Sequence, residues 1–159
     1  MLEKYDFVVD AMLGKLARWL RVMGYSVYYD PKLEDKDLLQ VADRQATILV
    51  TRDRLLAYRA NKLGIKAILV GEDLEDQLKA LADKCGLSIG INLDRTRCPK
   101  CNARLKETCR EHVKDKVPQE ILRLYEKFYL CLRCGSVYWL GSHYLNMQKK
   151  LHKLSFNNK

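Results

Sequence analysis

The amino-acid sequence predicts an α/β fold in which a parallel sheet is followed by a smaller, cysteine-rich unit. Over residues 1–92, short apolar segments rich in β-branched residues alternate with helical segments, which is the pattern of βαβ units joined by right-handed connections. Over residues 93–159 this alternation stops, and two Cys-x-x-Cys turns stand among lysines and arginines. These observations predict two units with a boundary between residues 92 and 93.

The first strand and helix set the pattern of the predicted sheet. Phe7–Val9 is apolar and β-prone, Asp10 follows it, and leucines at helical spacing then continue to Gly24. Further strands are expected at residues 25–29, 46–50 and 66–70, and further helices from residue 35, at 55–63 and at 74–85. In the second unit, a short helix is expected at 119–128 and an amphipathic one at 144–156.

The composition limits the class of protein. Hydrophobic residues make up 48% of the 159-residue chain, which is enough for a packed core. No apolar run approaches the roughly 18 residues of a membrane-spanning helix, and the amino-terminal sequence lacks the layout of a signal peptide. We therefore expect a soluble, cytoplasmic protein whose six cysteines are metal ligands or buried thiols rather than disulfides.

The positive charge is concentrated in the second part of the chain. Residues 1–95 hold 15 Lys and Arg against 15 Asp and Glu, whereas residues 96–159 hold 14 against 5. The net charge of +9 therefore comes from the second part, which favours a polyanion such as nucleic acid as the partner. A basic tail that serves only solubility is the alternative.

The two Cys-x-x-Cys turns predict a structural zinc site. Cys98 and Cys101 form one turn, Cys131 and Cys134 form the other, and 29 residues lie between them. Each turn can present two thiolates to one ion, and four thiolates complete a tetrahedron with no open position for chemistry. Such an ion would stabilise a segment too small and too polar to build its own core. Reduced surface cysteines, or disulfides in an oxidising compartment, are the alternatives.

Acidic residues follow two of the predicted strands. Asp10 follows the first strand, Asp53 follows the third, and Asp35 and Asp37 begin the helix between them. Because the carboxyl ends of parallel strands share one edge of the sheet, these carboxylates can converge where ligands of such sheets bind. Clustered carboxylates need a cation, and Mg²⁺ or Mn²⁺ suits them and activates water for attack on a phosphodiester. The alternative is that each Asp only caps a helix.

Basic residues accompany these acids. Lys15, Arg18 and Arg21 share one face of the first predicted helix, and Arg52 stands beside Asp53. These cations can bind the phosphates that flank a reacting phosphodiester. An ordinary solvated helix face is the alternative interpretation.

Other chemistries find little support. The sequence contains no G-x-G-x-x-G, no P-loop and no G-x-S-x-G motif. His112, His143 and His152 are isolated and lie in no nucleophile or zinc-protease motif. Tyr138 and Trp139, just past the second cysteine turn, are expected in the core of a small ribbon, with base stacking as the alternative.

Several of these motifs together resemble a known ribonuclease family. Residues 9–21 (VDAMLGKLARWLR) with Gly24 and Tyr25, and residues 49–54 (LVTRDR), carry the resemblance in the first unit. Residues 97–102 (RCPKCN) and 131–143 (CLRCGSVYWLGSH) carry it in the second. They are similar to the PIN-like ribonucleases of the Mut-seven C-terminal RNase domain family, and the resemblance covers nearly the whole chain.

The resemblance implies a PIN-like three-layer α/β/α nuclease domain at residues 1–92 and a zinc ribbon with a basic tail at 93–159. It further implies a metal-dependent endoribonuclease in which Asp10, Asp35 and Asp53 hold Mg²⁺ or Mn²⁺, with Asp37 assisting. The ribbon then helps to bind RNA. PIN domains often carry a fourth acid soon after the Thr-x-Asp motif, but Arg54 follows here.

The sequence leaves several alternatives open. A catalytically weak RNA-binding protein with a degenerate nuclease fold is the second hypothesis, and a phosphatase for small esters is the third. The RNA substrate, the cleavage position, the preference for RNA over DNA and the oligomeric state stay undecided, although PIN-like domains often form homodimers. Also undecided are the middle acid (Asp35 or Asp37), a fourth acid (Asp73 or Asp76) and the role of Cys109.

Overall fold

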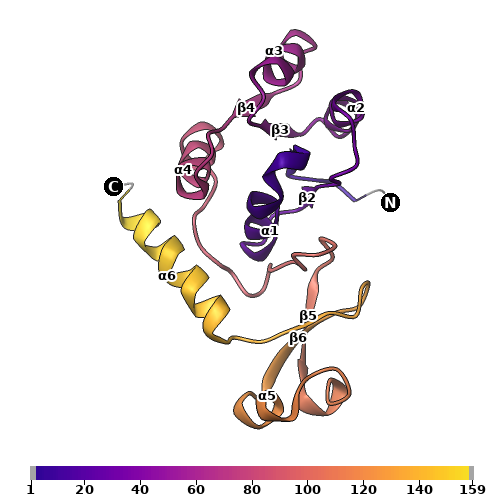
Figure 1. The fold of residues 1–159 in the computed structure, drawn as a ribbon, viewed down its shortest axis with the longest axis vertical. Coiled ribbons are helices and arrows are strands. Elements are labelled where there is room, and N and C mark those ends of the chain that lie inside the picture. Colours follow the sequence, from indigo (N-terminus) through magenta and orange to yellow (C-terminus); the bar gives the residue numbers. More distant parts are fainter. Residues whose placement is uncertain (1–2, 158–159) are drawn as a thin grey trace.

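The computed structural model describes residues 3–157 and contains two sheets (Figure 1). The strands of the first, parallel sheet are β1 (Phe7–Val9), β2 (Val27–Tyr28), β3 (Ile48–Thr51) and β4 (Ala67–Leu69). The helices that follow these strands in turn are η1 (Ala11–Leu13) continued by α1 (Gly14–Val22), α2 (Asp35–Gln45), α3 (Arg54–Lys62) and α4 (Leu74–Cys85). The predicted alternation of strands and helices is confirmed, with strands shorter than expected.

The order of the parallel strands places the ends of β1 and β3 side by side. The order is β2-β1-β3-β4, so Phe7 of β1 lies opposite Val27 on one side and Ile48 on the other. From β1 the chain first winds outward to β2 and then crosses back to β3, which makes the boundary between β1 and β3 the topological switch point. Ligands of open α/β sheets bind outside the carboxyl ends of the strands at such a point.

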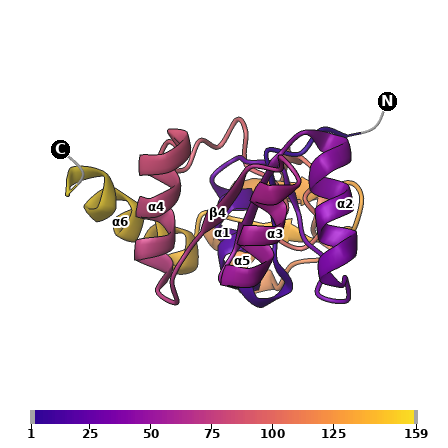
Figure 2. The ribbon, with the colours of Figure 1, turned by 90° about the horizontal axis from the view of Figure 1, so that it is seen from above.

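Helices cover both faces of the parallel sheet. On one face, Phe7, Val9 and Val50 pack with side chains of α1 and α4. On the other face, Val8 and Leu49 pack with side chains of α2 and α3. Figure 2 shows α4 on one side of the molecule and α2 on the other. Strands buried on both faces are apolar at successive positions, and the predicted α/β/α layering is confirmed.

The second sheet belongs to a small antiparallel ribbon. Its strands β5 (Leu105–Cys109), β6 (Lys127–Cys131) and β7 (Val137–Tyr138) pair in that order, and η2 (Arg110–His112) and α5 (Gln119–Leu124) lie between the first two. Its small core consists of Val113, Val117, Leu122 and Phe128. The helix predicted at residues 119–128 ends at Leu124, because Phe128 belongs to β6 and is fully buried in this core.

The last helix, α6 (Ser142–Phe156), returns to the α/β unit. Met147, Leu151 and Leu154 are buried in the same apolar cluster as α1 and α4, and Figure 2 shows α6 beside α4. The amphipathic helix predicted at residues 144–156 is confirmed, and its apolar face completes the core of the first unit. None of the helices in residues 3–157 is long and apolar enough to cross a membrane.

The buried side chain of Arg21 joins the ribbon to the α/β unit. Its guanidinium donates two hydrogen bonds to the carbonyl of Val27, at 2.9 and 3.3 Å, and one to the carbonyl of Pro99, at 3.0 Å. Pro99 lies in the first cysteine turn, and the nearby Asn102 Oδ1 accepts a hydrogen bond from the Val27 backbone N–H at 2.8 Å. Arg21 and Asn102 are 4% and 3% exposed. These bonds fix the first cysteine turn against α1 and β2.

We expect Arg21→Met to destabilise the folded protein by about 2–3 kcal/mol, because two buried carbonyl groups lose a charged hydrogen-bond donor. The free energy of unfolding is measured by urea titration of the zinc-loaded protein. Arg18→Met is the matched control, since Arg18 is exposed on the same helix, and its effect should stay within about 0.5 kcal/mol. Equal effects of the two substitutions on the free energy of unfolding would contradict the role of Arg21 in joining the ribbon to the α/β unit.

Candidate functional site

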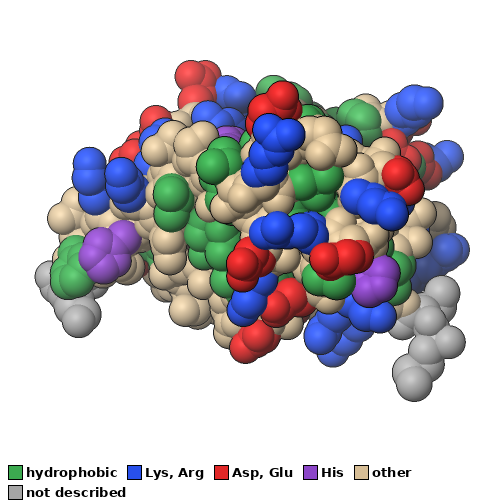
Figure 3. Space-filling view, turned by 90° about the horizontal axis from the view of Figure 1, so that it is seen from below, with side chains coloured by type: hydrophobic (Ala, Val, Ile, Leu, Met, Phe, Trp, Pro, Cys, Tyr) green, Lys and Arg blue, Asp and Glu red, His purple; other side chains and the backbone are tan. Residues whose placement is uncertain are grey.

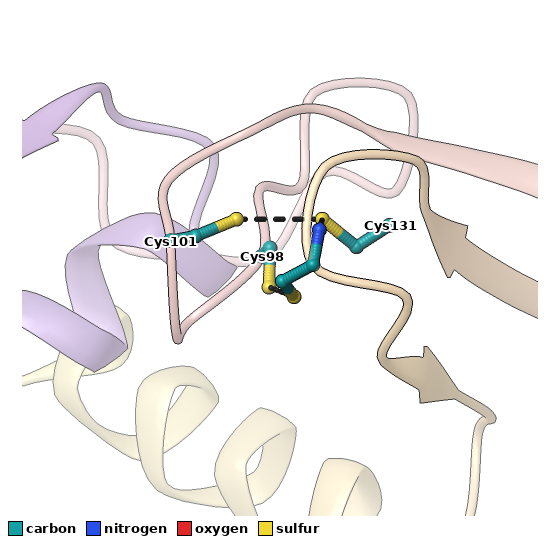
Figure 4. Close-up of side chains that lie close together, drawn as sticks. Cys98, Cys101 and Cys131 are labelled. Carbon is teal, nitrogen blue, oxygen red and sulfur yellow. Dashed lines mark hydrogen bonds between the residues drawn. The ribbon is translucent and has the colours of Figure 1, made fainter.

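Four cysteines from the two predicted turns lie together (Figure 4). The Sγ atoms of Cys98, Cys101, Cys131 and Cys134 are within 4.8 Å of one another. Cys101 Sγ is 3.4 Å from Cys131 Sγ, and Cys98 Sγ is 3.6 Å from Cys134 Sγ. A zinc–thiolate tetrahedron has edges of about 3.8 Å, whereas a disulfide bond is about 2.05 Å long. The arrangement therefore fits four ligands of one zinc ion.

The surroundings shift the pKa values of Cys98, Cys101 and Cys134 in opposite directions. Burial raises the pKa of Cys101 to about 12 and also raises the pKa of Cys98. Hydrogen bonding with Ser136 lowers the pKa of Cys134 to about 6. A bound zinc ion favours the thiolate form of every ligand. Burial also lowers the pKa of Arg21, and the neighbouring Cys101 and Cys98 oppose that shift.

A closed four-sulfur site has a structural role, because no coordination position remains for a substrate. It joins the turn before β5 to the turn between β6 and β7, and the same turn before β5 is bound to α1 through Arg21. The remaining cysteines lie elsewhere: Cys85 is half-buried on α4, and Cys109 is exposed at the end of β5. The first cysteine turn therefore takes part both in the four-cysteine site of the ribbon and in the attachment of the ribbon to the α/β unit.

A second candidate site lies at the carboxyl edge of the parallel sheet, where a hydroxyl group connects two acidic residues. Thr51 Oγ1 donates a hydrogen bond to Asp10 Oδ2 at 2.7 Å and accepts one from the backbone N–H of Asp53 at 2.9 Å. Asp10 is 6% exposed, Thr51 is fully buried, and Asp53 is exposed. The switch point between β1 and β3 thus carries one buried and one exposed carboxylate.

Helix capping explains Asp53 and does not explain Asp10. Asp53 Oδ1 accepts hydrogen bonds from the backbone N–H groups of Leu55 and Leu56, at 2.8 and 3.2 Å, and so caps α3. Asp10 precedes η1 without a capping hydrogen bond, and its carboxylate is bound by Thr51 instead. Burying a carboxylate is costly, so a buried acid that caps no helix is the stronger functional candidate.

The other predicted acids lie at the beginnings of α2 and α4. Asp35 and Asp37 lie in the first turn of α2; Asp35 is exposed and Asp37 is half-buried. Asp73, one alternative for a fourth acid, caps α4. A possible metal site needs at least three His, Cys, Asp or Glu residues whose ligand atoms lie within 4.8 Å of one another. Among residues 3–157, the four cysteines meet this criterion and no group of carboxylates does. The carboxylates do not form a preassembled three-ligand set.

The donor chemistry of this edge nevertheless fits Mg²⁺ or Mn²⁺. Mg²⁺ is usually held by one or two carboxylates and keeps several waters, which substrate phosphates complete. Asp10 and Asp53 offer two carboxylates there. The N-termini of the helices that follow the parallel strands face the same edge, and their positive dipole ends favour a phosphate. The edge therefore combines ligands for a hard cation with a favourable position for an anion.

Three of the predicted phosphate-binding residues lie near this edge on the surface. Lys15 and Arg18 are exposed on α1, and Arg52 is half-buried and forms an ion pair with Glu72 at 2.8 Å. Lys15 and Arg52 line a hollow of 260 Å³ together with Lys150 of α6. Glu72, Asp73 and Glu75 line the same hollow, so its charge is mixed rather than positive.

Three residues have structural roles that the sequence analysis did not identify. Thr51 connects the two acids, and its signal in the sequence is the Thr-x-Asp spacing with Asp53. Asn102 binds the first cysteine turn to β2, and its left-handed backbone, with φ of 73°, is one that asparagine tolerates. Arg21, grouped by sequence with the phosphate-binding residues, is buried in the joint between the units.

The fold and the two sites define an α/β protein with an open carboxyl edge and an attached ribbon whose four clustered cysteines could hold a zinc ion. A family model described as the Mut7-C RNAse domain matches residues 5–151. The chain therefore belongs to the Mut7-C RNAse domain family, which confirms the resemblance seen in the sequence and supports a ribonuclease role in general. No curated protein and no solved structure matches the chain.

Zinc content tests the four-cysteine site. We expect one zinc ion per chain, and Cys98→Ser should lower this content to near zero and unfold the ribbon, because a structural site contributes directly to folding. Metal content is measured by mass spectrometry and structure by circular dichroism. Cys109→Ser, in an exposed cysteine outside the cluster, should keep the zinc. Loss of zinc from Cys109→Ser, or full zinc in Cys98→Ser, would contradict the assignment.

Proposed function

We propose that this protein is a metal-dependent ribonuclease that hydrolyses internal phosphodiester bonds of RNA at the carboxyl edge of its parallel sheet. In this proposal Asp10, Asp35 and Asp53 hold Mg²⁺ or Mn²⁺, and Asp37 assists them. The observation that carries the proposal is the buried Asp10 carboxylate, bound by Thr51 at the switch point of a chain that belongs to an RNase domain family.

The residues of this edge have distinct tasks in the proposed reaction. Thr51 holds Asp10 in one orientation through Oδ2 and leaves Oδ1 for a metal ligand role. Asp53 stands beside it on the first turn of α3. Lys15, Arg18 and Arg52 bind phosphates on either side of the bond that is cut. The metal, when bound, lowers the pKa of a water and offsets the charge that develops on the phosphodiester.

The ribbon supports this reaction without taking part in bond cleavage. Its zinc site is closed, so its contribution is to hold the basic second part of the chain against α1. We propose that this part helps to bind RNA. Since zinc–thiolate sites suit a reducing compartment, we also propose that the protein acts in the cytoplasm.

A catalytically weak RNA-binding protein is the second candidate function. One observation favours it: the carboxylates of residues 3–157 do not lie within the distances of a three-ligand metal set. The basic second part of the chain would then supply affinity alone.

RNA cleavage separates these two functions. We expect the zinc-loaded wild-type protein to cleave RNA when Mn²⁺ is added, and Asp10→Asn and Asp53→Asn each to lower the rate by about 100-fold or more. Asn keeps an acceptor for the Thr51 hydroxyl at position 10 and a capping group at position 53, so a loss of rate reports lost charge. Product length on single-stranded and structured RNA is measured by gel electrophoresis.

Asp83→Asn is the matched control, because Asp83 is exposed in the second half of α4, away from the strand ends. It should retain the wild-type rate. Metal-dependent cleavage that survives both Asp10→Asn and Asp53→Asn would refute the proposed site. RNA binding without cleavage under either metal would favour the second candidate, and hydrolysis of small phosphate esters with little RNA affinity would indicate a phosphatase.

A further inference from the structure

A large cleft separates α1 from the ribbon and the beginning of α6, and it is outside the site described above. Its volume is 670 Å³, which is within the range of ligand-binding pockets. Residues from four segments line it: α1, the chain before β5, the ribbon and the first turns of α6. The lining is largely apolar and includes six Trp and Tyr side chains: Trp19, Tyr125, Tyr129, Tyr138, Trp139 and Tyr144.

The charged side chains that line the cleft are all positive. Its charged lining residues are Lys15, Arg18 and Arg97, and no Asp or Glu among residues 3–157 contributes to it. Arg97 is already bound to Glu3 at 2.8 Å, so Lys15 and Arg18, both exposed, supply the available positive charge. The face at the ribbon end differs, because Figure 3 shows Lys, Arg, Asp and Glu mixed there around exposed hydrophobic side chains. The cleft therefore combines aromatic faces with cations alone.

Trp139 belongs both to the ribbon core and to the lining of the cleft. The sequence analysis expected it in the ribbon core, and one edge does pack on Phe128, with ring centroids 6.4 Å apart. The side chain is only half-buried, and it also lines the cleft. Tyr144 lies in the first turn of α6 and is half-buried in the same way. Both rings line the cleft and are half-buried, and the Trp139 ring is also packed against Phe128.

Aromatic faces beside cations bind unpaired nucleobases, because every base can stack on a ring while its phosphate contacts Lys or Arg. A duplex cannot use such a cleft in this way, since its bases are already stacked and paired. A purely apolar peptide face would use the aliphatic part of the lining but would leave the exposed cations Lys15 and Arg18 without a partner. The lining favours single-stranded nucleic acid.

Lys15 also connects the cleft to the proposed catalytic edge. It lines both the cleft and the 260 Å³ hollow that contains Arg52 after β3 and Met12 after β1. Arg18 lies one helical turn further along α1, on the cleft side. The two cavities therefore meet at Lys15, and a strand whose bases lie in the cleft can place its backbone along Lys15 and Arg18.

We infer that the cleft between α1 and the ribbon binds an unpaired stretch of RNA by base stacking, chiefly on Trp139 and Tyr144, and presents the adjoining backbone to the carboxyl edge. The inference rests on the proposed ribonuclease function and adds the substrate class: the protein selects single-stranded RNA over duplex RNA. Its test measures binding without cleavage, so that the two proposals can fail separately.

The two tryptophans of the chain give a direct readout, because Trp19 and Trp139 both line the cleft. The zinc-loaded protein is titrated in the absence of Mg²⁺ and Mn²⁺. One ligand is a ten-nucleotide oligouridylate, and the other is an RNA hairpin whose duplex stem has the same length in nucleotides per strand. Binding is followed by tryptophan fluorescence and by anisotropy of fluorescein-labelled RNA. We expect the single strand to quench the tryptophan fluorescence and to bind at least about tenfold more tightly than the hairpin.

Substitutions in the cleft should weaken only this mode of binding. Trp139→Leu and Tyr144→Leu keep apolar bulk but remove the stacking face, and each should weaken oligouridylate binding by roughly five- to a hundredfold. Trp139→Phe and Tyr144→Phe should restore most of the affinity. The matched control is Tyr58→Leu, since Tyr58 is an exposed aromatic residue on α3, outside the cleft, and it should bind as the wild type does.

Several outcomes would overturn the inference. These are equal affinity for hairpin and single strand, wild-type affinity in both leucine variants, or unchanged tryptophan fluorescence on binding. A stable dimer in sedimentation that Trp139→Leu dissociates would assign the cleft to a second copy of the chain. If the leucine variants bind normally while the wild type cleaves RNA in Mn²⁺, the cleft proposal fails alone. Selective binding of the single strand with no cleavage overturns only the ribonuclease proposal.

Discussion

The pairing of β1 with β2 on one side and β3 on the other is the constraint on which the rest of the structure depends. It places α1 and α2 on opposite faces and leaves the ends of β1 and β3 adjacent at the carboxyl edge. Asp10 and Thr51 meet there because the register aligns Val9 with Val50. An apolar sheet covered on both faces excludes polar groups elsewhere, so polar chemistry is confined to this edge and to the surfaces beside it.

The four-cysteine cluster and Arg21 together hold the small polar ribbon in position against the α/β unit. The ribbon core consists of a few side chains around Phe128, too few to order a long basic segment alone. Its two cysteine turns meet at the four clustered thiols, which can hold one zinc ion, and Arg21 and Asn102 bind the first turn to β2. These contacts place the ribbon beside α1, and both contribute to the lining of the cleft.

Local patterns in the sequence predict much of this structure, and long-range contacts account for the rest. Alternating strands and helices, the two cysteine turns and the acids after β1 and β3 are visible because strand ends and Cys-x-x-Cys spacing are local signals. The burial of Arg21 is not, since its partners Val27 and Pro99 lie in other elements. Likewise, helical spacing identifies the apolar face of α6 without showing that α4 and α1 cover it.

The central claim is that the carboxyl edge at Asp10 holds a catalytic divalent cation. Anomalous diffraction from a crystal of the zinc-loaded protein soaked in Mn²⁺ tests this claim most directly. A manganese peak at about 2.1 Å from a carboxylate oxygen of Asp10 is the predicted result, with Asp53 or Asp35 close to the same ion. An ordered edge with no peak, or manganese bound only at distant carboxylates, would contradict the claim.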